Sequence, residues 1–171
     1  HRRALTAIEA GKFDREIVPM NGLSTDETPR ETTLEQMASL DPIFGLEKIT
    51  AGVASQTCDG SSAMLIASEE AVKRYNLKPR ARVHHMSVRA EDPMIMLTAP
   101  IMTTEYALKR SGMTMKDIDL VEVNEAFAPV PMAWLKDIDF PHEKTNVNGG
   151  AIALGHPIGS TGTKLMTTLL H

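Results

Sequence analysis

His156 lies in a glycine-rich stretch, NVNGGAIALGHPIGSTG, which spans Asn146 to Gly162 and holds five of the eleven glycines of the chain. Glycine loses more backbone entropy on folding than any other residue, so this density is typical of a backbone that turns tightly or lies close to a ligand. Apolar residues recur at helical spacing after Pro157, and we expect a buried helix to begin at Ile158 or Gly159. An imidazole beside a helix N-terminus is favoured in its neutral form, which can accept a proton from a nucleophile. A solvated histidine in a surface loop is the alternative.

Asn124 is the second residue whose position suggests chemistry, because it ends the apolar segment DLVEVN. This segment has the pattern of a buried strand, and α/β proteins commonly place ligands at the carboxyl ends of strands. Asparagine is equally well suited to cap the helix that we expect over Ala126–Lys136. From these residues alone, a catalytic role and a capping role both remain open.

The elements that must position these two residues alternate between strand and helix. We expect helices up to Gly11, over Thr33–Leu40, after Ser68, over Ile101–Ser111 and over Ala126–Lys136, and strands over Phe13–Met20, Ala63–Ala67, Arg82–Val88 and Asp119–Asn124. Such alternation indicates an α/β domain.

Two blocks of the sequence resemble signatures of one enzyme family. GGAIALGHPIGSTG resembles the histidine signature of the thiolases, and VEVNEAF, at Val121–Phe127, resembles their second signature. The separation of the two blocks also suits that family. The related β-ketoacyl synthases typically have a histidine at the position of Asn124, so the NEAF sequence favours the thiolase branch. The resemblance covers nearly the whole chain.

The resemblance implies an α/β fold with the layered α-β-α-β-α architecture of the thiolases. We expect residues 1–45 to be the end of the loop domain and residues 46–171 to be the C-terminal domain, truncated before a final cysteine-glycine block. The chain starts without an initiator Met and stops within an apparent helix, so we expect both ends to be cut.

The same resemblance implies catalytic roles for His156 and Asn124. The family's histidine helps to activate a nucleophilic cysteine and donates to the thioester oxygen, and its asparagine holds a water that completes an oxyanion hole with the histidine. The nucleophilic cysteine would precede this chain, and a second, acid-base cysteine would follow it. Cys58 lies in SQTCDG, which matches neither cysteine block, and is interpreted as a small loop residue.

VASQTCDG resembles the family loop that contacts the pantetheine arm of CoA. Ala54 and Ser55 match that loop and are expected to bind CoA, whereas Val53 replaces its usual asparagine. Phe127 is expected to wall the acyl or pantetheine pocket. The alternatives are a plain loop before a strand and an aromatic core residue.

A thiolase would be an acyltransferase. It would cleave 3-ketoacyl-CoA to acetyl-CoA and a shortened acyl-CoA, or condense two acetyl-CoA, through an acyl-cysteine intermediate, with CoA as substrate and no cofactor. The resemblance also implies a homodimer or homotetramer. We expect this chain alone to be inactive, because both family cysteines lie outside it. A non-catalytic thiolase-like protein that binds CoA or acyl groups is the competing hypothesis.

Composition excludes several other classes of protein. The chain has 171 residues, of which 42% are hydrophobic, enough for one compact core, and a formal charge of −4 without a basic run, so we expect no nucleic-acid partner. Its apolar runs are too short for a membrane span. A single cysteine suits a reducing cytoplasm. The spacing of His84, His85 and His142 is not that of metal ligands, so we expect no metal site.

Overall fold

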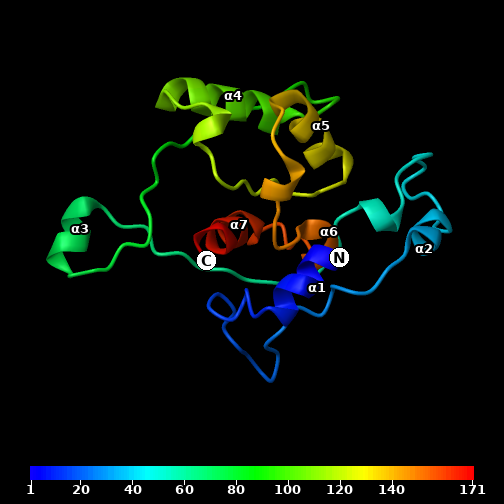
Figure 1. The fold of residues 1–171 in the computed structure, drawn as a ribbon, viewed down its shortest axis with the longest axis horizontal. Coiled ribbons are helices and arrows are strands. Elements are labelled where there is room, and N and C mark those ends of the chain that lie inside the picture. The colour runs from blue at the N-terminus through cyan, green and yellow to red at the C-terminus, as the bar shows by residue number, and fades with distance from the viewer.

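The computed structural model describes all 171 residues, which form seven α-helices and three short 3-10 helices joined by loops. In chain order the elements are α1 (Arg2–Glu9), α2 (Leu34–Ala38), η1 (Ala51–Val53), α3 (Glu69–Arg74), α4 (Ala99–Ser111), η2 (Met115–Asp117), α5 (Pro129–Ile138), η3 (His142–Lys144), α6 (Ala151–Leu154) and α7 (Thr161–Leu170). Helices α1, α6 and α7 gather in the middle of the molecule, α4 and α5 lie side by side above them, and α3 projects to one side (Figure 1).

Local signals fix the ends of several expected helices. Helix α2 begins with a capping box in which Thr33 and Gln36 bond each other's backbone, although it ends at Ala38, before the expected limit. The Ser68 hydroxyl accepts from the backbone N–H of Ala71 at 3.1 Å and caps α3. Helix α4 ends at Gly112, whose φ of 70° is the left-handed conformation that glycine adopts without strain.

Two helices begin later than the sequence pattern predicts. Helix α5 starts at Pro129 instead of Ala126, because a proline at the first position needs no backbone partner and the residues before it bond to another segment. Helix α7 starts at Thr161 instead of Ile158 or Gly159. The intervening residues form a turn in which the backbone N–H groups of Ser160 and Thr161 both donate to the Pro157 carbonyl.

None of the four expected strands forms a hydrogen-bonded ladder. Residues 13–16 lie in turns, whereas Ala63–Ala67 and Arg82–Val88 have no backbone bond to a neighbouring segment. Two of the expected strands have isolated bridges: Met20 pairs with Leu23 across a local turn, and the segment ending at Asn124 pairs through a parallel bridge between Val121 and Thr145. A strand needs a partner as well as a suitable sequence, and residues 1–171 supply almost none.

The buried side chains form two small cores. The first joins α1 to α6 through Ala4, Ala7, Phe13, Ala153 and Leu154. The second is built by Val123, Trp134 and Phe140, with side chains of α4 and α5 packed around it. The extended segment before Asn124 therefore presents Val123 to a core.

Much apolar surface remains exposed. The solvent-accessible area is 12345 Å², whereas a compact monomer of this size exposes about 8,300 Å². Leu65, Ile66, Met86 and Val88 are each more than 70% exposed, and they lie on two of the segments predicted as strands. The pattern that predicted those strands marks surface that no other part of residues 1–171 covers. None of the helices combines the length and the apolar character needed to cross a membrane.

Trp134 is the best test of the second core. Its side chain is 2% exposed, meets Phe140 edge to face at 5.9 Å, and donates its indole N–H to the Thr104 hydroxyl at 2.9 Å. We expect Trp134→Ala to lower the free energy of unfolding of the full-length protein by about 3–5 kcal/mol, measured by denaturant titration. Lys136→Ala, on the exposed face of the same helix, should change it by less than about 0.5 kcal/mol. Equal effects of the two substitutions would contradict this core.

Candidate active site

His156 is delivered by a tight turn between α6 and α7. Gly155 has a φ of 83°, and a Cβ at that position would overlap the Cys58 sulfur, so both the conformation and the space require glycine. The backbone N–H of His156 donates to the Gln56 carbonyl at 2.9 Å. A segment 100 residues earlier therefore holds the backbone of His156, so the histidine does not lie in a free surface loop.

The structure brings His156 and Asn124 together. The Nε2 atom of the imidazole lies 3.3 Å from the side-chain nitrogen of Asn124, although the residues are 32 positions apart. The other ring nitrogen, Nδ1, contacts the hydroxyl of Thr161 at 2.7 Å. Thr161 was missed by sequence reasoning. The available signal was a hydroxyl residue just after the expected helix start and five positions after the histidine.

Asn124 does not cap a helix. Helix α5 begins at Pro129 after the N-cap Ala128, so the capping alternative is wrong. The side-chain oxygen of Asn124, Oδ1, is buried and has no hydrogen-bond partner. A buried acceptor of this kind is costly unless a donor reaches it, and a water molecule is the simplest donor.

The three residues expected to contact CoA lie on two segments that pair beside Asn124. Ala54 and Phe127 form an antiparallel bridge. The Ser55 N–H donates to the Ala126 carbonyl at 3.0 Å, and the Ala128 N–H donates to the Val53 carbonyl at 2.8 Å. This pairing brings the three predicted residues next to one another. Ala54 is buried, and Phe127 is half-buried.

Gln56 links this loop to the histidine turn and was also missed. Its side-chain amide donates to the carbonyls of Ile152 and Ala153 at 2.9 and 3.2 Å, in addition to the backbone bond that it accepts from His156. The only sequence signal was its position directly after Ser55. The bonds of Gln56 hold the loop and α6 at a fixed separation.

Glu125 connects the two signature blocks. Its carboxylate accepts from the Asn146 amide at 2.9 Å and from the Ile152 N–H at 3.1 Å. A side chain at Gly150 would overlap that carboxylate. Asn146 also bonds both the N–H and the carbonyl of Val123 at 2.8 Å. The backbone on either side of Asn124 is thereby tied to the segment that leads to His156.

The carboxyl of Glu122 is the most perturbed acid near the site. Burial raises its pKa from 4.5 to about 7, Lys164 opposes the shift, and the charges of Glu125 and Glu16 add to it. Burial likewise raises the pKa of the Cys58 thiol, although a bond from the His156 N–H opposes the shift. The thiol is therefore the dominant form of Cys58 at neutral pH.

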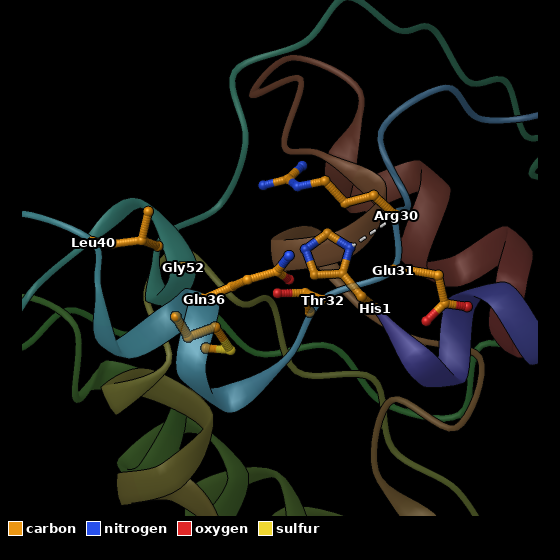
Figure 2. A pocket seen from close by; sticks show the side chains of 8 residues that line it. His1, Arg30, Glu31, Thr32, Gln36, Leu40 and Gly52 are labelled. Atoms are coloured by element: carbon orange, nitrogen blue, oxygen red, sulfur yellow. Dashed lines mark hydrogen bonds between the residues drawn. The ribbon is translucent and has the colours of Figure 1, made fainter.

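A pocket of about 250 Å³ opens beside the loop that holds Ala54. It is lined by His1, Arg30, Glu31, Thr32, Gln36, Met37, Leu40 and Gly52. In Figure 2, Leu40 and Gly52 lie across the pocket from His1 and Arg30. The Arg30 guanidinium donates to the Gln56 side chain at 2.7 Å, so the pocket adjoins the loop to which the histidine turn is hydrogen-bonded. No cluster of three or more His, Cys, Asp or Glu residues has an arrangement able to hold a metal ion.

Comparisons with known proteins place these features in a family. The model of the thiolase C-terminal domain matches residues 77–171, and that of the thiolase N-terminal domain matches residues 1–70. The chain is 56% identical to a steroid 3-ketoacyl-CoA thiolase, FadA6, of Mycobacterium tuberculosis, over 99% of this chain and 43% of that protein. It is 46% identical to the mitochondrial 3-ketoacyl-CoA thiolase of Bos taurus, over 99% of this chain and 45% of that protein.

Solved structures agree. The human mitochondrial 3-ketoacyl-CoA thiolase in complex with CoA gives a TM-score of 0.96 at 46% identity, covering 99% of this chain and 44% of that one. The acetyl-CoA acetyltransferase of Bacillus anthracis gives 0.92 at 40% identity, covering 100% and 46%. These likenesses confirm the expected mixed α/β fold, although few of its strands form here. The chain spans less than half the length of the relatives that it matches.

Glu122 predicts a dependence of stability on pH. Its folded-state pKa of about 7 lies above its ordinary value of 4.5, so the folded state binds more protons between these values. The stabilising contribution is complete below pH 4.5 and is lost as the pH rises through 7. Relative to the wild type, Glu122→Gln should therefore gain up to about 3 kcal/mol between pH 5 and pH 8, measured by denaturant titration of the full-length protein. Glu143→Gln, at an exposed position, should follow the wild-type curve, and a Glu122→Gln curve that also does so would refute the assignment.

Proposed function

The chain belongs to the thiolase family, and on that premise we propose that the whole protein is an acyl-CoA acyltransferase. It cleaves 3-ketoacyl-CoA with CoA to give acetyl-CoA and a shortened acyl-CoA, or runs the reverse condensation of two acetyl-CoA. The observation that carries the proposal is the contact between His156 Nε2 and the Asn124 amide. The two signature blocks meet there at a single point, where a reacting thioester oxygen could be bound.

In this proposal His156 serves the chemistry in two ways. Its neutral imidazole takes the proton of the attacking cysteine thiol, which leaves a thiolate and an imidazolium. The protonated ring then donates to the thioester oxygen as negative charge develops there. Asn124 contributes through a water bound at its unpartnered carbonyl oxygen. As the acyl group passes to the cysteine, the C–C bond between the 3-keto carbon and its neighbour breaks, and the departing enolate takes a proton from the second, acid-base cysteine to give acetyl-CoA. The acyl group then passes to the sulfur of CoA, which releases the cysteine thiol.

We propose that CoA enters along the paired segments that carry Ala54, Ser55 and Phe127. Small side chains at positions 54 and 55 let backbone groups approach the thin pantetheine chain, and the Phe127 ring supplies an apolar wall. The pocket beside Gly52 continues this path and presents the positively charged Arg30, which suits the phosphate groups of CoA. CoA is a substrate here, and the proposed reaction uses no metal or redox cofactor.

The remaining assignments are also proposals. Residues 1–45 are proposed to end the loop domain, and residues 46–171 to form the C-terminal domain. The protein is proposed to be a cytoplasmic homodimer or homotetramer. Light scattering of the full-length protein tests the oligomeric state.

Substitution of the two site residues tests the function. With acetoacetyl-CoA and CoA as substrates, Asn124→Ala should lower kcat of the full-length protein by about 10²–10³, the range for loss of one oxyanion-hole donor. His156→Ala should lower it by at least about 10², because a general base is lost as well. His84→Ala, at an exposed histidine outside the two signature blocks, should retain full activity. A wild-type protein that binds CoA without turnover would establish the binding-protein alternative instead.

The isolated chain provides a second test. Residues 1–171 should show no CoA-dependent cleavage of acetoacetyl-CoA, because Cys58 is their only thiol and burial raises its pKa. The full-length protein at the same concentration is the positive control. Turnover by the isolated chain above the uncatalysed rate would contradict the need for a cysteine from outside it.

A further inference from the structure

Thr161 places a buried hydroxyl beside the candidate base. The residue is 5% exposed and opens α7. Its hydroxyl oxygen lies 2.7 Å from His156 Nδ1 and 3.0 Å from the Pro157 carbonyl oxygen. No water is needed to satisfy it, since both neighbours are within hydrogen-bond distance.

The two contacts can both be hydrogen bonds in only one arrangement of the protons. A hydroxyl has one proton to donate, and a carbonyl oxygen can only accept. If the Thr161 proton is directed to the Pro157 carbonyl, which also accepts from the N–H groups of Ser160 and Thr161, the Thr161 oxygen is free to accept. The shorter contact with His156 then runs in the opposite direction, with Nδ1–H donating to the Thr161 oxygen.

The far side of the ring agrees with this assignment. A neutral imidazole protonated on Nδ1 carries a lone pair on Nε2. The Asn124 amide nitrogen, a donor, lies 3.3 Å from that atom. The hydrogen bonds thus run in one direction, from Asn124 to His156, from His156 to Thr161 and from Thr161 to Pro157. Each contact then pairs one donor with one acceptor.

We propose that Thr161 is a positioning residue that fixes the tautomer of His156, so that Nε2 is the proton acceptor of the site. The catalytic part of this inference rests on the proposed function, whereas the tautomer itself does not. Thr161 acts through the ring and touches no reacting atom. Its role is to keep the proton of the neutral ring on Nδ1, because a protonated Nε2 could not accept a proton from the nucleophile.

The arrangement serves both protonation states. When a thiol gives its proton to Nε2, the S–H bond breaks and an N–H bond forms, while Nδ1–H remains bonded to Thr161. The Thr161 hydroxyl does not have to rotate, because its own proton remains hydrogen-bonded to the Pro157 carbonyl. The imidazolium is thereby stabilised without rearrangement at Nδ1. The contact from Asn124 at 3.3 Å is long, so its loss in this step costs little.

Ser160 supplies a matched control. Its hydroxyl donates to the same Pro157 carbonyl, at 3.2 Å, and has no bond to the imidazole. Ser160→Ala therefore removes a hydroxyl from the same turn without changing the partner of Nδ1. Thr161→Val removes the acceptor at nearly constant volume, and Thr161→Ser keeps it.

The direct test is nitrogen NMR of the full-length protein labelled with ¹⁵N-histidine, at a pH where the ring is neutral. The His156 signal is assigned by its absence in His156→Ala. We expect the Nδ1–H tautomer in the wild type, Thr161→Ser and Ser160→Ala, and a shift toward Nε2–H in Thr161→Val. Thr161→Val should also lower kcat for thiolysis about tenfold to a hundredfold with little change in KM, a part of what a general base contributes, and Thr161→Ser should restore it.

The possible outcomes separate the two proposals. An Nε2–H tautomer in the wild type, or an unchanged tautomer in Thr161→Val, overturns the role of Thr161. A tautomer change in Ser160→Ala equal to that in Thr161→Val also overturns it, because the effect would then belong to the turn as a whole. If the tautomers are as expected but the wild type has no thiolysis activity, the proposed function fails while the assignment of the tautomer stands.

Discussion

The candidate site depends on the carboxylate of Glu125. It bonds Asn146 and the N–H of Ile152, and so it joins the segment before α5 to the segment that leads into the histidine turn. Hydrogen bonds to a charged acceptor are stronger than neutral ones. The carboxylate occupies the space that a side chain at position 150 would need, which only glycine leaves open. Asn124 and His156 come from different segments, so their separation of 3.3 Å depends on such long-range links and has no local cause. The bonds of Asn146 to Val123 and of Gln56 to the histidine turn act together with the Glu125 link.

Hydrogen bonds, more than packing, hold this part of the molecule. The two apolar cores are small, and Thr145 and Asn146, at 1% and 3% exposure, are among the most buried residues of the chain. Arg3 extends the network by donating to the Thr145 carbonyl at 2.7 Å, which ties α1 to the same strip of backbone. A buried polar network is stable only when nearly every member is satisfied, and it then specifies one geometry. The unpartnered oxygen of Asn124 is an exception, and it lies where the proposed reaction needs a bound water.

The sequence predicted what is decided locally. The cap at Ser68, the stop at Gly112 and the tight glycine turn before His156 depend on neighbouring residues, and each occurs as expected. The strands failed because pairing needs a partner that residues 1–171 do not provide. Gln56 and Glu125 were missed because their partners lie up to 100 and 27 positions away, and no local pattern encodes such bonds. The signature blocks identified Asn124 and His156, but the contact between them became visible only in three dimensions.

Cys58 shows why these residues make up only part of the proposed site. Its sulfur lies against Gly155, at the backbone of the turn, while the imidazole contacts Asn124 and Thr161. No hydrogen bond joins Cys58 to either ring nitrogen, and burial favours its protonated form. In the proposed reaction the cysteine that gives its proton to Nε2 therefore comes from outside residues 1–171. If Nε2 is the acceptor, as proposed, the attacking sulfur must approach the ring on the side of Asn124. The proposed base, the proposed water site at the Asn124 side chain and the incoming nucleophile then lie on the same side of the imidazole.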